Sequence, residues 1–184
     1  MKRVLLLLST TVLLPSAVRA QSTEADIQRA LLAAPAAMRA AATVLELRPD
    51  GTTAVLRPGT NGLICWDNGG RPGFIDPVDV ECTAEANRVR LEQNHAFQSA
   101  GGTQAEIRAR FDEAEADGTR VTSVFGTIYY RVIGSSLDDY RTHTAVAVPY
   151  ATGESIGLPT ARGPALLWLM EAGTSSAHLM VSGM

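Results

Sequence analysis

The chain has 184 residues, with 16 Lys or Arg against 19 Asp or Glu, and its formal net charge is −3 at pH 7. An acidic balance gives no electrostatic footprint for nucleic acid or for an anionic membrane surface, so we expect neither as a partner. Lys2 is the only lysine and lies in the leader described next. Its removal excludes chemistry that needs a lysine amine, such as Schiff-base formation, a Ser–Lys dyad or a phosphate-loop lysine.

Residues 1–20 have the three-part pattern of a cleavable secretory signal peptide: a basic start, an apolar run over 4–14, and small or aliphatic residues before the cut. The apolar run is about half of the roughly 20 residues that a membrane span needs, which disfavours an anchor. We predict cleavage before Gln21, no membrane insertion afterwards, and a periplasmic or secreted protein. Residues 21–184 are long enough for a single globular domain, with 13 basic and 19 acidic residues.

Cys65 and Cys82 are the two cysteines of the chain. An even count in an exported protein predicts a disulfide, which would close a loop of about 18 residues and contribute on the order of 3 kcal/mol. The loop is rich in Gly and Pro, so we expect no regular element within it. The alternative is a metal or redox pair, which the absence of a CxxC spacing and of a nearby histidine disfavours.

The first part of the domain predicts one helix followed by short strands. Ser22 or Thr23 can cap the helix, whose apolar residues recur at helical spacing. From Thr43 the period changes to two, and a Pro-Asp-Gly turn at 49–51 predicts a hairpin of 43–47 with 53–56. A second turn at 59–62 leads to a third strand over 63–66.

Two helices are expected next. Thr83 is the expected cap of the first, which the glycine pair 101–102 ends. Thr103 and Glu106 form a capping-box pattern for the second, which Gly118 ends. The expected buried residues are Ala86, Val89, Ala96 and Phe97 in the first helix and Ile107, Phe111 and Ala114 in the second.

The remainder is rich in strand-forming residues. Strands are expected over 121–133, with Gly126 as a bulge, and over 144–150, 166–170 and 179–181, with a loop near 134–139 and a helical turn near 153–159. This order of elements predicts an α+β fold, with a mainly antiparallel sheet of about five to seven strands and two to three helices packed on it.

The three histidines are the strongest candidates for chemistry. We expect His95 on the solvated face of its helix. His143 and His178 lie in separate predicted strands, and Asp138 and Asp139 precede the first of them. If the two strands are neighbours, these residues would form a general acid–base or metal cluster. The alternative is that both histidines are structural.

Several segments resemble one family. They are residues 56–62 followed by Cys65, the strand start at His143, residues 157–160 and the ending 172–181. Together they resemble an uncharacterised family of exported bacterial proteins with no activity attached to it. The resemblance covers most of the mature chain and implies that the segments of His143 and His178 belong to a shared framework. It supplies no catalytic residues.

We therefore expect a non-catalytic exported domain that binds a small molecule or a partner protein, with no cofactor and no metal. Two alternatives stay open. One is a metal-dependent or histidine-based hydrolase that uses His143, His178 and Asp138 or Asp139. The other is a structural component of the cell envelope.

Overall fold

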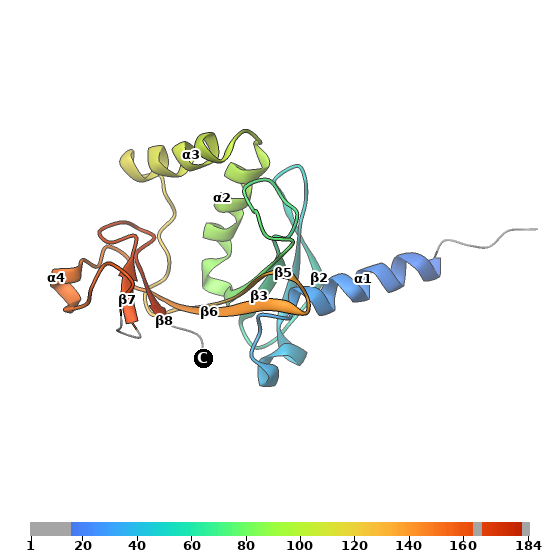
Figure 1. The fold of residues 1–184 in the computed structure, drawn as a ribbon. Helices are drawn as coiled ribbons and strands as arrows, with labels where there is room; N and C mark the ends of the chain where they lie inside the picture. Colours follow the sequence, from blue (N-terminus) through green and yellow to red (C-terminus); the bar gives the residue numbers. More distant parts are fainter. Residues whose placement is uncertain (1–15, 164–166, 182–184) are drawn as a thin grey trace, which may run out of the picture.

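The computed structural model describes residues 16–163 and 167–181. In these residues eight strands form one twisted sheet in the order β2-β1-β3-β4-β5-β6-β8-β7 (Figure 1). Neighbouring strands are antiparallel except β1 and β3, which run parallel. The strands are β1 (Thr43–Leu47), β2 (Thr53–Arg57), β3 (Leu63–Asp67), β4 (Val78–Ala84), β5 (Ile128–Ser136), β6 (Asp139–Ala147), β7 (Leu167–Met170) and β8 (His178–Val181).

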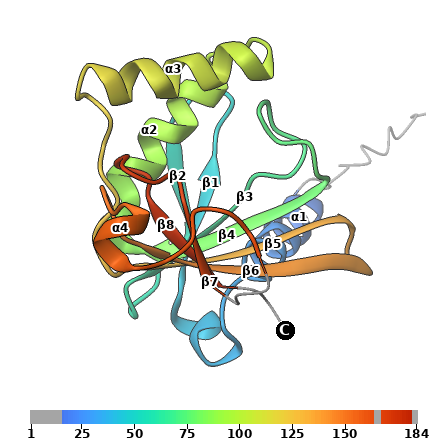
Figure 2. The ribbon, with the colours of Figure 1, turned by 60° about the vertical axis from the view of Figure 1, so that its left-hand side comes forward.

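The helices lie on both faces of this sheet. They are α1 (Ser16–Ala30), α2 (Arg88–Ser99), α3 (Gln104–Ala116) and the single turn α4 (Gly153–Ile156), with 3-10 turns at Ala36–Ala41 and Glu85–Asn87. Figure 2 shows α1 and α2 on opposite sides of the central strands. The predicted α+β class and mainly antiparallel sheet are confirmed, although the sheet has more strands than the five to seven expected.

The alternation of side chains along the strands gives the sheet one apolar core on each face. On the α1 face, Val44 of β1 packs with Ile27 and Ala30 of α1. On the other face, Ile64 and Trp66 of β3 pack with Leu91 of α2. Both faces of the central strands are therefore covered, and the α2 face continues into the site described below.

The predicted disulfide is present. Cys65 and Cys82 lie directly opposite one another in β3 and β4, their sulfur atoms are 2.14 Å apart, and both residues are fully buried in the α1-side core. The loop between them was wrongly expected to hold no regular element, since β4 begins inside it at Val78. Five residues of β4 pair with β5, so sheet pairing overrides the local turn composition.

The helix after β4 differs most from its prediction. Thr83 lies within the strand, where its hydroxyl donates to the Ile128 carbonyl at 2.9 Å, and does not cap a helix. Val89 is 62% exposed. The buried side chains of α2 are Arg90, Leu91 and His95, because this is the side of the helix that the sheet and the following loops cover.

The expectation of a solvated His95 was wrong. The residue is 2% exposed, and its Nε2 lies 2.7 Å from the Arg48 carbonyl oxygen while its Nδ1 lies 3.2 Å from the Ser99 hydroxyl. Burial lowers the pKa of His95 below its ordinary value of 6.5. The histidine is thus a hydrogen-bonded core residue that ties α2 to the β1–β2 turn.

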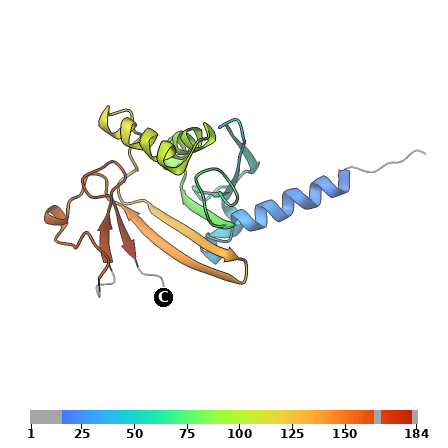
Figure 3. The ribbon, with the colours of Figure 1, turned by 45° about the horizontal axis from the view of Figure 1, so that its top comes forward.

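Helix α3 follows its prediction. Thr103 and Glu106 form the capping box, and Ile107 and Ala114 are buried. The helix packs on α2 (Figure 3), where the rings of Phe97 and Phe111 meet edge to face with centroids 5.3 Å apart.

The C-terminal part contains the expected strands with shifted bounds. Residues 121–127 are irregular and not a strand, and Gly126 occupies a turn at φ +78° before β5. The irregularity of the β5–β6 hairpin lies between Gly134 and Ser136. A side chain at Gly134 would meet the Asp139 carbonyl oxygen at 2.2 Å, which explains the glycine there.

Residues 1–15 of the predicted signal peptide lie outside the described residues, and α1 begins at Ser16 and passes through the predicted cut. Its buried residues Ile27 and Ala30 follow Gln21, so cleavage there would keep the packed part of the helix. Within the part of the chain that the structure describes, no helix has the length and apolar character needed to cross a membrane.

Candidate functional site

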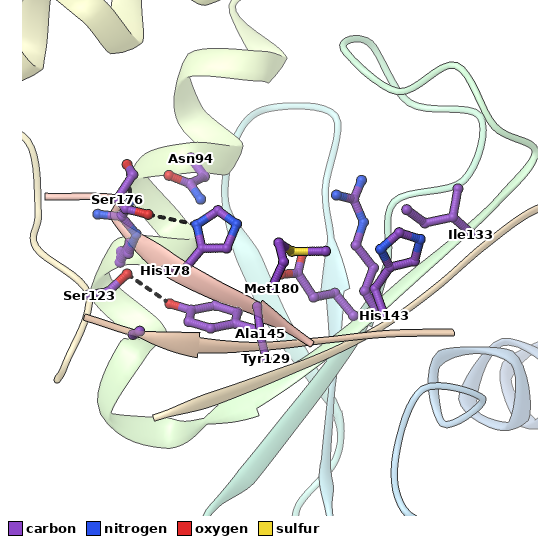
Figure 4. Close-up of a pocket in the computed structure, with 13 residues that line it drawn as sticks. Asn94, Ser123, Tyr129, Ile133, His143, Ala145, Ser176, His178 and Met180 are labelled. Atoms are coloured by element: carbon purple, nitrogen blue, oxygen red, sulfur yellow. Dashed lines mark hydrogen bonds between the residues drawn. The ribbon is translucent and has the colours of Figure 1, made fainter. Parts of the chain in front are cut away.

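A pocket of about 230 Å³ lies on the α2 face of the sheet, beside the central core. Figure 4 shows the 13 side chains that line it, contributed by β4, β5, β6, β8, α2 and two loops. Four strands supply its floor because side chains of one parity along each strand share a face. Helix α2 and the loops before β5 and before β8 supply its wall.

The strand register places the floor residues in rows across the sheet, and two of these rows differ in character. In the first row, Arg131 of β5 lies opposite Glu81 of β4 and opposite His143 of β6. In the second, Ala145 of β6 lies between Tyr129 of β5 and Met180 of β8. One row is therefore charged or titratable and the other is mostly apolar, so the floor offers both kinds of contact to an occupant.

Arg131 of the charged row forms a partly buried ion pair with Asp79 of β4. Arg131 donates to Asp79 through Nε at 2.9 Å and through Nη2 at 2.5 Å, and the side chain of Asp79 is 2% exposed. This two-point contact fixes the guanidinium plane and neutralises its charge. Burial raises the pKa of the neighbouring Glu81 carboxyl, an effect that the positive charge of Arg131 opposes.

The structure brings His143 and His178 to the same pocket but not into contact. Their strands are neighbours, as the cluster hypothesis required. However, His178 lies opposite Ala147, four residues beyond His143, which corresponds to roughly 14 Å of strand at about 3.4 Å per residue. Figure 4 shows Met180 between the two rings.

Each histidine has its own partner. Nε2 of His143 lies 3.0 Å from Nε of Arg141, and burial, followed by the charge of Arg141, lowers the pKa of His143. Nδ1 of His178 lies 2.8 Å from the Ser176 carbonyl oxygen. Because a carbonyl only accepts, Nδ1 is the protonated nitrogen of His178, and its Nε2 is the acceptor of the neutral ring.

The two predicted acids lie outside the pocket. Asp138 and Asp139 are exposed at the turn of the β5–β6 hairpin, where the Ser135 hydroxyl donates to Asp139 at 2.7 Å. The cluster proposed from the sequence, two histidines with Asp138 or Asp139, is therefore not assembled. The carboxyl group that does line the pocket with both histidines is Glu81, and the alternating pattern of residues 78–84 was the signal that could have placed it on a strand.

The wall of the pocket contains a buried arginine that the sequence analysis missed. Arg90 is 7% exposed. Its Nη1 donates to the Val121 carbonyl, and its Nη2 donates to the Ser176 hydroxyl at 2.6 Å. A second pocket of about 430 Å³ adjoins the first between α2, α3 and the loop before β8, and Arg90 lines both. The two pockets therefore share a wall that carries positive charge.

The described residues contain no group of three or more His, Cys, Asp or Glu side chains that could hold a metal ion. No family model matches the sequence, and neither the curated proteins nor the solved structures gave a match. The interpretation of the site therefore depends on its own geometry.

Proposed function

We propose that the chain is an exported, non-catalytic domain that binds a small molecule in the pocket over β4, β5, β6 and β8. The observation that carries this proposal is the convergence of polar groups from separate elements around an apolar strip. Arg90 and Asn94 come from α2, Ser176 from the loop before β8, and Ala145 and Met180 from the floor. Binding sites typically combine an apolar surface with a few polar groups that orient the ligand.

The size of the pocket limits the ligand. A volume of about 230 Å³ equals that of roughly eight water molecules at about 30 Å³ each. Pockets that bind drug-sized ligands commonly measure roughly 300–1,000 Å³. We therefore expect a small metabolite and not a peptide segment or a large cofactor.

A thermal-shift screen of the purified protein against small metabolites tests this proposal. A ligand that binds only the folded state stabilises it, by about 2.7 kcal/mol at 100 times its dissociation constant. For a chain of this length that amounts to roughly 5–10 °C in the unfolding midpoint.

Two variants on one strand identify the pocket as the site. Ala145→Phe places a ring in the pocket and should remove the shift. Thr142→Phe adds the same ring to the exposed opposite face of β6 and should leave the shift unchanged. If no compound shifts the midpoint, or if the shift survives in Ala145→Phe, the proposal is wrong.

A histidine-based hydrolase is the second candidate, because His143, His178 and Glu81 line one pocket. A carboxyl with a raised pKa in a cleft is a general-acid candidate. Glu81 would then supply the role that the sequence assigned to Asp138 or Asp139. Turnover of an ester or amide substrate that is lost in both His143→Ala and His178→Ala would favour this function over simple binding.

A further inference from the structure

Four residues line both pockets and form what we call the polar junction: Arg90, Asn94, Arg131 and Ser176. Arg131 already has a carboxylate partner, since it pairs with buried Asp79. Arg90 does not. Among the residues that the structure describes, no carboxylate oxygen lies within 4.0 Å of its guanidinium. A buried charge is ordinarily paired, so the junction lacks one negative group.

A second buried arginine increases this imbalance. Arg120 is 8% exposed, and its Nη1 and Nη2 donate to the amide oxygens of Gln93 and Asn94. It likewise has no carboxylate within ion-pair distance in the described chain. Burial, followed by the positive charge of Arg90, lowers the pKa of Arg120 to about 10. Two guanidinium groups that repel one another in a cavity wall favour a bound anion.

The side chain of Asn94 is oriented by this arrangement. Because its Oδ1 accepts from Arg120, its NH2 group is left on the other side of the amide. Figure 4 places that nitrogen on the side of His178. The Ser176 hydroxyl accepts from Arg90 and still has its own proton to donate. The junction thus offers donors from three side chains.

Two acids lie near the junction, but neither forms an ion pair with Arg90 or Arg120. Burial favours the neutral form of Glu81, as its raised pKa indicates. Glu115 lines the second pocket, but its two oxygens accept from the Ser175 backbone N–H at 2.7 Å and from the Ser175 hydroxyl at 2.6 Å. Against the effect of its burial, these hydrogen bonds, followed by the charges of Arg120 and Arg90, lower the pKa of Glu115. Its carboxylate therefore holds the loop before β8 and acts on the two arginines only from a distance, which leaves room for an anion in contact with Arg90.

We infer that the ligand of the proposed pocket is a small carboxylic acid, with its carboxylate at the polar junction beside Arg90 and its hydrocarbon part on Ala145, Met180 and Ile133. This inference rests on the proposed function and names its ligand class. A carboxylate carries one negative charge, which would give Arg90 the partner it lacks, and its two oxygens accept from the donors of the junction. A dianionic phosphate would place a second negative charge near the Glu115 carboxylate.

Calorimetric titration of the purified protein with propionate, succinate and benzoate tests the inference. The corresponding amides are the matched neutral probes, and inorganic phosphate is the third arm. Hydrogen bonds to charged groups contribute roughly 1.5–3 kcal/mol, so we expect the best acid to bind about 10- to 100-fold more tightly than its amide. Phosphate should not displace it.

Two variants connect that preference to the junction. Arg90→Met removes the charge and should weaken binding of the best acid by a similar factor, whereas Arg88→Met on the same helix, outside both pockets, should not. Asn94→Asp covers the case in which Arg90→Met fails to fold. Its new carboxylate would pair with Arg120, maintain folding and repel the acid. Thr142→Asp adds the same charge to the far face and should leave binding unchanged.

The outcomes separate this inference from the proposed function. Selective binding of acids that is lost in Asn94→Asp supports both the proposed pocket and its carboxylate ligand. In a second outcome, acids and amides bind equally, with no effect of Asn94→Asp and with loss of binding in Ala145→Phe. That result overturns the inference of a carboxylate ligand and leaves the pocket as a binding site. Displacement of the acid by phosphate also overturns the inference of a carboxylate ligand and indicates a general oxyanion site. If neither these probes nor any compound of the screen binds, both are overturned.

Discussion

Removal of the bond between Cys65 and Cys82 is the perturbation whose size follows most directly from the structure. The cysteines are 17 residues apart in sequence and opposite one another in β3 and β4. In the chain-entropy model, opening a loop of this length lowers the free energy of unfolding by about 3 kcal/mol. The native strands should stay paired, because their register extends from Leu63 to Asp67 and other core residues hold both strands against α1.

Urea denaturation of the oxidised protein, of the reduced protein and of the double variant Cys65→Ala/Cys82→Ala measures this effect. The reduced protein should remain folded, since domains commonly have about 5–15 kcal/mol of stability. Its denaturant slope should rise, because an unfolded chain without the cross-link exposes more surface. The double variant should not respond to reductant, and its difference from the reduced protein gives the packing contribution of the two sulfur atoms.

A loss below about 1 kcal/mol with an unchanged slope would refute the reasoning, because the bond would then not constrain the unfolded chain. Mass spectrometry with and without reductant provides an independent check. A pair of free thiols in protein purified from the exported fraction would contradict both the pairing and the predicted compartment.

Further predictions concern the core, two titrating residues and one helix cap. Leu91→Ala should lower the free energy of unfolding by about 2–5 kcal/mol in urea denaturation, and a loss below 1 kcal/mol would contradict the packing of α2 on the sheet. Burial lowers the pKa of His95, so the unfolded state binds the proton more readily and stability should fall as pH drops below 6.5. In His95→Gln the denaturation midpoint should depend less on pH below 6.5, although the pH dependence that comes from the lowered pKa of His143 remains. The pKa of Glu81 is raised in the folded state, so the pH dependence of stability has the opposite sign: the contribution of Glu81 is complete below pH 4.5 and is lost as pH rises through the folded-state pKa. Glu81→Gln should flatten the stability profile over this pH range, and an unchanged profile would refute the raised pKa. Thr103→Ala should lower the free energy of unfolding by about 1 kcal/mol, because it removes the hydroxyl that accepts from the Glu106 backbone N–H, and a loss near zero would show that the cap is unimportant.

Features that depend on residues close in sequence could be predicted without the structure. The capping box of Thr103 and Glu106 needs only neighbours three residues apart. The β1–β2 hairpin follows from a turn tripeptide between two short strand patterns, and the disulfide was predicted from there being only two cysteines in a chain with a predicted export signal. In each case, the partners that decide the outcome can be recognised from local sequence or from composition.

The candidate site depends on interactions that the sequence could not specify. Glu81, Arg131 and His143 form one row only because three strands pair in a particular register, and β4 exists only because β3 and β5 supply its hydrogen-bond partners. A register shift of one residue would turn the whole row to the other face. Likewise, Arg90 and His95 are buried because of what lies against α2, which overrides the ordinary preference of polar residues for solvent. The sequence alone determined the covalent link and those elements that local capping and turn residues specify, whereas the tertiary structure decided which side chains share a pocket, because that requires partners distant in sequence.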